Sequence, residues 1–488
     1  MSDHRSSRGP KLAKTLRIFA LAALPFAVTT FASTSANAQA WLRDRTYQEG
    51  IGIRVGDVEL HPGVGAEVGV DSNWFVRSHT EGPNIVNGPP TSPIREAGVI
   101  RVTPSFSFGT PGDQRLDGQR PSFTYRGSVA GSYREFIGTE VNDQRNMNVH
   151  ATFRGDILPG RPVGVGFFAG YQRFVQPPAL PGVAVSFNRS DLNAGTEVIV
   201  IPGGGTLDMH LGYQFYGALY ESTQGAAFTN FTHELSFKNR WRFRPKTSLF
   251  TETGLSFVNY PNSDRSVLAL NDAIPFRTRA GINGLLTPRL SLLAALGYSA
   301  TFLAGQGVQT STSQFDSLNA QLEGTIYLTG TAAPSNDPTA ITAVSTLTLG
   351  YTRDVIVGSA QSFQSRPTYI FGGGQNTTLG SYTGLDKFYG RLSYMFAGRA
   401  VLSLDGYFDI LTIPAAGLAA NAPPATFTNF RPGVSLFGEY RFADSFGINA
   451  TIDYVQQISE TQIQIGPTQV FDLNNRRVQA MLGFRWFM

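Results

Sequence analysis

The chain has 488 residues, of which 15% are charged, 41% hydrophobic and 12% aromatic, with 53 glycines, no cysteine and a formal net charge of +4. Soluble globular domains carry about 25% charged residues, so this composition argues against a soluble enzyme. The 36 phenylalanines and 18 tyrosines argue against a disordered chain, and beyond the N-terminal region no run of about 18 apolar residues predicts a transmembrane helix.

Residues 1–38 are predicted to be a cleaved secretory signal peptide. Basic residues precede an apolar stretch over Ile18–Phe31, and Ala36 and Ala38 provide a small-residue cleavage site. A membrane-anchoring helix is the weaker interpretation, because Pro25 interrupts the apolar stretch. The mature protein is therefore expected to be exported.

The mature chain is predicted to consist of a short N-terminal periplasmic segment, 39–56, and one all-β domain over 57–488. Apolar and polar residues alternate along this domain, as in Val401–Ile410, which is typical of a strand with one face in water. We count eighteen such strands, with sixteen as the alternative. They begin near Val58, Gly98, Ser122, Met147, Val163, Leu192, Leu207, Phe231, Leu249, Phe276, Leu290, Leu318, Val344, Phe388, Val401, Arg431, Phe446 and Val478.

The connections alternate between short and long. Tight turns follow even-numbered strands, at Pro159-Gly160, Pro202–Gly205, Arg244–Lys246, Thr287–Arg289, Ala397-Gly398 and Ala443-Asp444. Segments 109–120 and 330–339 are exceptions, because they are long where a short turn is expected. Longer polar segments, such as 356–382, follow odd-numbered strands. Short turns at one rim and long loops at the other predict a transmembrane antiparallel up-and-down β-barrel with its short turns in the periplasm. A soluble sandwich is disfavoured, because single cores stop growing near 250–300 residues.

Both ends of the mature chain carry motifs. The alternating C-terminal strand ends in Phe484, Trp486, Phe487 and Met488, and it resembles the β-signal that the barrel-assembly machinery recognises in bacterial outer-membrane proteins. Gly52–Pro62, running on to Asp71-Ser72-Asn73-Trp74-Phe75, is similar to the opening of an uncharacterised family of porin-like β-barrels. These resemblances imply the outer membrane of a Gram-negative bacterium, with outer-membrane lipid, lipopolysaccharide and the assembly machinery as partners.

The polar face of each strand is predicted to line the barrel lumen, where cations and acids are nearly balanced. Arg101, Arg126 and Arg154 fall on three successive strands and predict a basic ladder on one wall; the favoured alternative is that these arginines pair with acids. The predicted pore-lining residues are Arg101, Arg126, Arg154, Asp208, Glu234, Lys238, Glu252, Arg277, Arg279, Glu323, Arg391, Asp405, Arg431 and Asp453.

Eight aromatic residues near strand ends are expected to form the girdles found at membrane interfaces. They are Trp74, Trp241, Phe243, Tyr260, Tyr440, Phe442, Trp486 and Phe487.

Barrels of about 16–18 strands leave an aqueous channel, so the sequence predicts a passive, porin-like conduit for small hydrophilic solutes. The loop 356–382 is the candidate constriction. A polysaccharide-export barrel is the alternative, and a surface-exposed structural or adhesive barrel is the second. No enzyme activity, cofactor, metal site or nucleic-acid partner is predicted, because the histidines lack metal-ligand spacing and there is no cysteine.

Overall fold

The computed structural model describes most of the chain from residue 50 onward. The described residues are 50, 52–75, 94, 96–110, 121–138, 141–175, 188–222, 226, 229–262, 272–304, 314–329, 345–357, 382–396, 399–414, 426–459, 462–464, 470–472 and 474–488. The predicted signal peptide with Ala36 and Ala38, the turn Ala397-Gly398 and most of the loop 356–382 lie outside these ranges.

Nearly all of the described residues form β-strands. The strands are β1 (Ile53–Val55), β2 (Val58–Asp71), β3 (Ala97–Gly109), β4 (Phe123–Ile137), β5 (Asn146–Ile157), β6 (Val163–Phe174), β7 (Arg189–Val200), β8 (Leu207–Tyr220), β9 (Asn230–Arg244), β10 (Thr247–Asn259), β11 (Asp272–Thr287), β12 (Leu290–Ala304), β13 (Gln314–Tyr327), β14 (Thr346–Val357), β15 (Tyr382–Phe396), β16 (Ala400–Pro414), β17 (Thr426–Ala443), β18 (Phe446–Ser459), β19 (Gln462–Gln464), β20 (Val470–Asp472) and β21 (Asn475–Phe487). No helix among the described residues is long and apolar enough to span a membrane.

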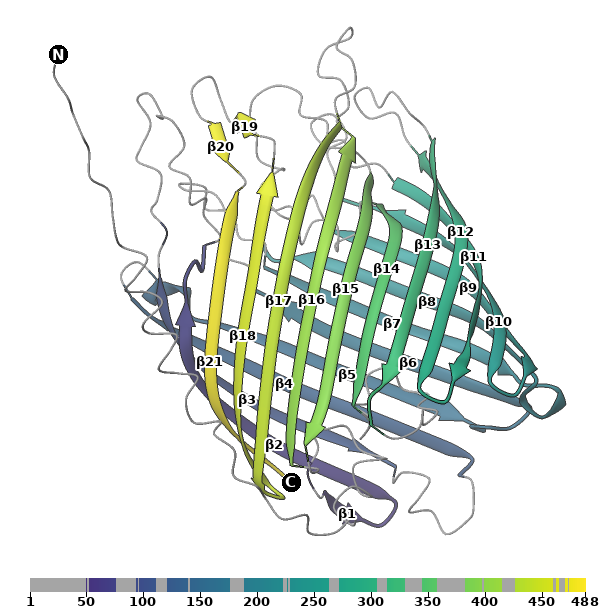
Figure 1. The fold of residues 1–488 in the computed structure, drawn as a ribbon, viewed down its shortest axis with the longest axis horizontal. Coiled ribbons are helices and arrows are strands. Elements are labelled where there is room, and N and C mark those ends of the chain that lie inside the picture. The colour runs from purple at the N-terminus through teal and green to yellow at the C-terminus, as the bar shows by residue number, and fades with distance from the viewer. Residues whose placement is uncertain are drawn as a thin grey trace, which may run out of the picture.

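The strands form one closed antiparallel barrel (Figure 1). Strands β2 to β18 pair in chain order, and β21 pairs with β18 on one side and with β2 on the other. The wall therefore has eighteen strands, which confirms the prediction over the alternative of sixteen. We call the line where β2 meets β21 the seam. The short strands β19 and β20 pair only with each other.

Residues 53–55, which lie in the predicted periplasmic segment 39–56, form strand β1. This strand makes a tight hairpin with β2, in which Val55 is opposite Val58. Gly56 lies in the turn with φ of 61°, a left-handed conformation that favours glycine. The hairpin lies at the end of the barrel where the chain's C-terminus lies (Figure 1).

Short connections gather at one end of the barrel, which we call the short-turn rim; the opposite end is the long-loop rim. Pro245 and Lys246 alone join β9 to β10, and Pro288 and Arg289 join β11 to β12. Both are among the predicted tight turns. Short turns of bacterial outer-membrane barrels face the periplasm, so the short-turn rim is predicted to lie on that side.

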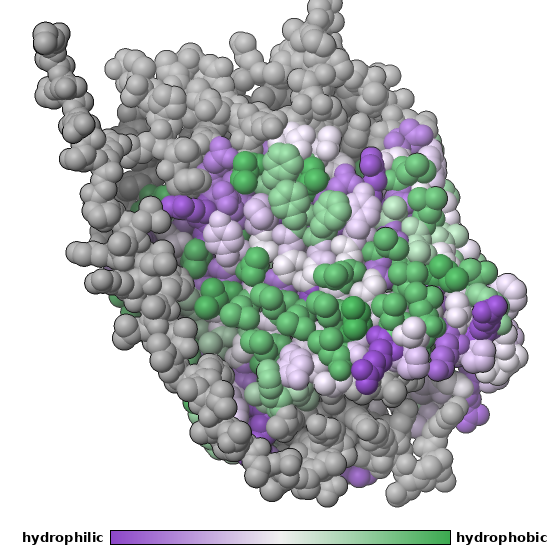
Figure 2. Space-filling view, in the orientation of Figure 1, coloured by the Kyte–Doolittle hydropathy of each residue, from purple (hydrophilic) through white to green (hydrophobic). Residues whose placement is uncertain are grey.

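The outer face of the wall is apolar. Large hydrophobic side chains on alternate positions are exposed, as for Leu211 (60%), Leu296 (64%) and Leu349 (57%), and they cover much of the visible wall in Figure 2. Such a surface is unfavourable in water but matches hydrocarbon, and ring closure leaves no unpaired strand edge in the bilayer. The alternate residues of each strand face the lumen.

The aromatic girdle is only partly as predicted. Trp241 (49%), Phe243, Tyr440 and Phe442 are exposed on the outer face, but the prediction is wrong for three aromatics that are 2–4% exposed: Trp74, Tyr260 and Phe487. Trp74 and Tyr260 follow the last residues of β2 and β10. Phe487 is at an inward-facing position of β21, and the Arg441 guanidinium lies 4.1 Å from its ring centroid.

Trp74 is the centre of a small apolar core inside the barrel near the long-loop rim. Its ring centroid is 4.3 Å from that of Phe136, and the Arg477 guanidinium lies 5.2 Å from the Trp74 ring. The buried members of this core are Trp74, Ala97, Val99, Phe136, Val141 and Met481. Because they come from both sides of the seam, the core ties the first strands to the last.

The segment Asp71–Phe75, which carries part of the family resemblance, fastens the seam at the long-loop rim. The Val478 N–H donates to Ser72 Oγ at 2.8 Å, and the Ser72 N–H donates to the Val478 carbonyl at 2.9 Å. The Arg477 guanidinium forms an ion pair with the buried carboxylate of Asp71. We call this set of contacts the seam clasp.

A polar network crosses the inner face of the seam above Gly483. On β2, Glu67 pairs with Arg101 of β3 and accepts a hydrogen bond from Asn449 Nδ2 of β18 at 2.7 Å. Gly483 of β21 lies between them, in register with both Glu67 and Asn449. The side chain of Glu67 can cross a neighbouring strand only because Gly483 has no side chain.

Candidate functional site: the inner wall

All fourteen predicted pore-lining residues lie at inward positions of their strands, alternating with the exposed apolar side chains. The structure brings most of them into pairs. Arg277 lies 2.7 Å from Asp354, Arg279 lies 2.6 Å from Glu252, and further ion pairs or hydrogen bonds join Arg391 to Asp405, Arg431 to Asp409, Tyr389 to Glu323, Ser256 to Glu234 and Ser435 to Asp453. Four of these contacts are ion pairs between an arginine and an acid, and in the other three a neutral hydroxyl group donates to the acid. Their role in lining a pore stays a prediction.

The predicted three-arginine ladder is wrong. Arg126 and Arg154 are direct cross-strand partners, but Arg101 is opposite Arg134. Arg126 and Arg134 are separated by eight positions of β4, about 27 Å along a strand. Arg101 instead pairs with Glu67 at the seam. The three arginines lie on three successive strands, but neighbouring strands are staggered. Arg101 is therefore far from Arg126 and Arg154.

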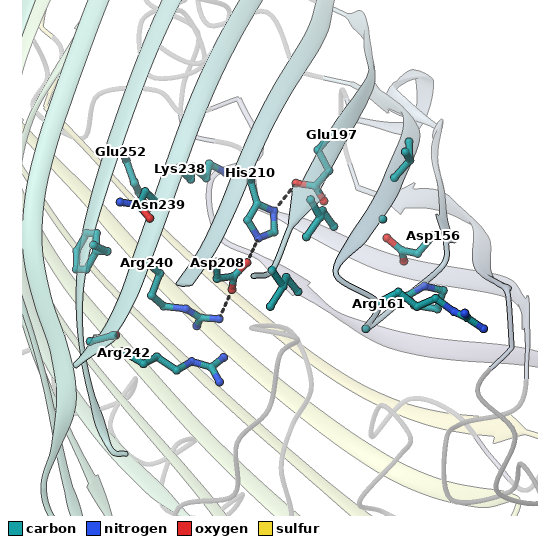
Figure 3. A pocket seen from close by; sticks show the side chains of 18 of the residues that line it. Asp156, Arg161, Glu197, Asp208, His210, Lys238, Asn239, Arg240, Arg242 and Glu252 are labelled. Carbon is teal, nitrogen blue, oxygen red and sulfur yellow. Dashed lines mark hydrogen bonds and ion pairs between the residues drawn. The ribbon is translucent and has the colours of Figure 1, made fainter. Parts of the chain in front are cut away.

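A cavity of about 660 Å³ opens on the inner wall near the short-turn rim, between β5 and β11 (Figure 3). Its charged lining is Arg154, Asp156, Arg161, Glu197, Asp208, His210, Lys238, Arg240, Arg242, Glu252 and Arg279. A second cavity of about 390 Å³ continues from it and shares Lys238, Glu252 and Arg279. Together they form a polar groove along this part of the wall.

A chain of hydrogen bonds runs along the cavity wall. His210 lies between two carboxylates, with Nδ1 3.2 Å from Glu197 Oε2 and Nε2 2.8 Å from Asp208 Oδ1. Arg240 Nη2 is 2.5 Å from the second oxygen of Asp208, and Arg154 Nη2 is 2.8 Å from Glu197. These contacts, drawn in part in Figure 3, hold the carboxylates of Glu197 on β7 and Asp208 on β8 in place. Both His210 nitrogens are engaged, so its ring is held in one orientation.

Strand β9 carries a column of cations on its inner face. Lys238, Arg240, Arg242 and Arg244 occupy successive inward positions, while Trp241 and Phe243 between them are exposed on the outer face. Lys238 belongs to the predicted set. Arg242 and Arg244 were missed, although the alternation continues unbroken to the turn at Pro245 and would have included them.

No group of three or more histidine and acidic side chains among the described residues is arranged to hold a metal ion. The acids at the cavity face arginine and histidine side chains instead. The inner wall therefore presents charge and hydrogen-bonding groups to a solute in the lumen.

A closed antiparallel barrel of eighteen strands, apolar outside and polar inside, is a transmembrane β-barrel of the bacterial outer membrane. No protein-family model matches the chain, and no curated protein matches it. Membership in the porin-like family named above therefore stays a prediction.

Solved structures similar to this chain are outer-membrane proteins. OccAB4 from Acinetobacter baumannii is 11% identical over 88% of this chain and 97% of that chain, with a TM-score of 0.41. A BenF-like porin from Pseudomonas fluorescens Pf-5 is 9% identical over 89% and 100%, with a TM-score of 0.42. The siderophore receptor PirA from Pseudomonas aeruginosa is 10% identical over 88% and 80%, with a TM-score of 0.37. Similarities of this size concern shape alone.

Proposed function

We propose that the protein is a porin-like channel for passive passage of small hydrophilic solutes across the outer membrane. The observation that carries the proposal is the polar inner face of a closed eighteen-stranded wall, with its groove near the short-turn rim. Barrels of this size enclose an aqueous lumen, whereas eight-stranded barrels are filled by their own side chains. Pore width and lumen charge would then determine which solutes pass.

The proposal includes neither catalysis nor a cofactor. We also propose the signal peptide over residues 1–38, recognition of the C-terminal strand by the barrel-assembly machinery, and kinship with the porin-like family, on the sequence motifs given above. Removing Phe487 and Met488 is the direct test of the C-terminal signal, since it should lower the yield of heat-modifiable barrel in the outer membrane.

Single-channel recording in planar bilayers tests the channel. We expect stepwise, ohmic conductance in KCl from purified protein whose folding is verified by heat-modifiable migration in gels. The heat-denatured protein at the same concentration is the control. Folded protein that inserts without conductance steps would contradict the proposal and would favour a structural or adhesive barrel.

Polysaccharide export remains the alternative within transport. Proteoliposome swelling with sugars of increasing size separates the two functions. A small-solute channel should pass monosaccharides and exclude long oligosaccharides, whereas equal entry of long neutral oligosaccharides would favour export.

A further inference from the structure

The cavity near the short-turn rim has an excess of positive charge. Six cations line it against four acids. Arg154 pairs with Asp156 and Glu197, and Arg240 pairs with Asp208. Arg279 pairs with the fourth acid, Glu252.

Three of the six cations have no acid partner among the described residues. Among the described residues, no carboxylate forms an ion pair with Arg161, Lys238 or Arg242. Lys238 and Arg242 flank Arg240 on the inner face of β9, and Figure 3 shows Arg240 and Arg242 side by side at the cavity wall, with Arg161 across from them. Free cations thus approach the cavity from two sides.

The opposite wall differs from this arrangement. On β15 to β17, Arg391 pairs with Asp405 and Arg431 pairs with Asp409, while Lys387 stacks on the Tyr407 ring at 5.1 Å. The two arginines named on β15 to β17 are ion-paired, whereas Arg242 on β9 forms no ion pair with a described carboxylate.

We infer that the cavity formed by β5 to β11 is an oxyanion-binding site for solutes with two or more negative charges, such as phosphate-bearing or dicarboxylate compounds. Guanidinium groups present paired N–H donors that match carboxylate and phosphate oxygens. The partnered acids hold Arg154, Arg240 and Arg279 in place, and the unpartnered Lys238 and Arg242 supply the attraction. A cavity of about 660 Å³ has room for a solute larger than inorganic phosphate.

The site would act as a local selectivity filter, a role that rests on the proposed channel function. A concave surface of one sign raises the local concentration of the opposite ion. We expect anion preference to depend mainly on the cations of this cavity, because several arginines elsewhere on the described wall are held in ion pairs with acids.

The test compares the wild type with Arg240→Gln/Arg242→Gln in planar bilayers, with inorganic pyrophosphate and malonate as probes. We expect the wild type to prefer chloride over potassium and pyrophosphate to reduce its current. Losing two charge-assisted contacts should weaken pyrophosphate binding about tenfold or more. The double variant Arg289→Gln/Arg399→Gln removes the same charge from turns at the same rim and should bind like the wild type.

A conservative variant separates charge from geometry. Arg240→Lys/Arg242→Lys retains the positive charge but removes the paired donors, so chloride preference should persist while pyrophosphate affinity falls. If the glutamine variant at β9 and the turn variant bind pyrophosphate equally and also bind malonate equally, the site is overturned and the channel stands. Loss of malonate binding alone would restrict the site to carboxylates, and loss of pyrophosphate binding alone would restrict it to phosphates; both outcomes support it.

Calorimetric titration of pyrophosphate into the folded, detergent-solubilised protein needs no open pore. If the wild type fails to conduct, the channel proposal fails, and the titration still decides the site. Malonate is titrated in the same way. Binding of either probe that the β9 glutamine variant abolishes would support the site, and binding of neither probe to the wild type would overturn it.

Discussion

Replacement of Trp74 by alanine should lower the free energy of unfolding by about 3 to 5 kcal/mol, the usual cost of emptying the space of a buried aromatic side chain. Trp74 is 2% exposed and packs on Phe136 at 4.3 Å between ring centroids. It also lies beneath the Arg477 guanidinium of the seam clasp. The loss therefore weakens the apolar core and the closure of the barrel together.

Denaturant unfolding of the protein in lipid vesicles measures this effect. Trp241→Ala is the matched control, because Trp241 is 49% exposed on the outer face, where lipid fills the space that the side chain leaves. We expect a much smaller change in the unfolding midpoint for this control. Equal midpoints for the two variants would show that Trp74 does not hold the seam.

Replacement of Gly483 by alanine should destabilise the barrel by about 1 to 3 kcal/mol, the range for overpacking a filled site. A Cβ at Gly483 would overlap Glu67 Cγ and lie 2.8 Å from Asn449 Oδ1 and 3.0 Å from the Ala66 carbonyl oxygen. Glu67 would have to move, which would break its contacts with Arg101 and Asn449.

Gly324→Ala provides the matched control for this prediction. Gly324 lies within β13, three residues before its end, and a Cβ there meets no atom within 4 Å. Alanine should be neutral or slightly stabilising at this position, since it reduces the freedom of the unfolded chain. An unchanged unfolding midpoint for Gly483→Ala would contradict the role of the seam network.

The alternation of apolar and polar residues made the fold predictable, because every strand of a barrel in lipid turns apolar side chains outward and polar side chains inward. The pattern in Val401–Ile410 assigns Leu404 to the outside and Asp405 to the lumen, as the structure does. The number of alternating segments predicts the eighteen strands of the wall. The pattern within a single strand is therefore enough to predict which of its side chains face lipid and which face the lumen.

Contacts between strands were not predictable in the same way. Whether Arg101 meets Arg126 or Glu67 depends on the pairing register, which the pattern of one strand does not determine. The inward turn of Trp74 depends on a core assembled from distant strands. The position of Arg242 is different, because the alternation of β9 continues to Pro245 and by itself places Arg242 on the inner face, whereas the predicted set on this strand ends at Lys238.

The seam joins parts of the chain that are far apart in sequence. Ser72 and Val478 are 406 positions apart, whereas Asp208 and Arg240 on neighbouring strands are separated by 32. Because the entropy lost in closing a loop grows with its length, hairpins between neighbours form readily and the seam is expected to form last. Until then the wall is an open sheet with two unpaired edges, which other chains can join. Because the seam clasp stabilises the closed barrel, it slows the reopening of the seam and so keeps these two edges away from other chains.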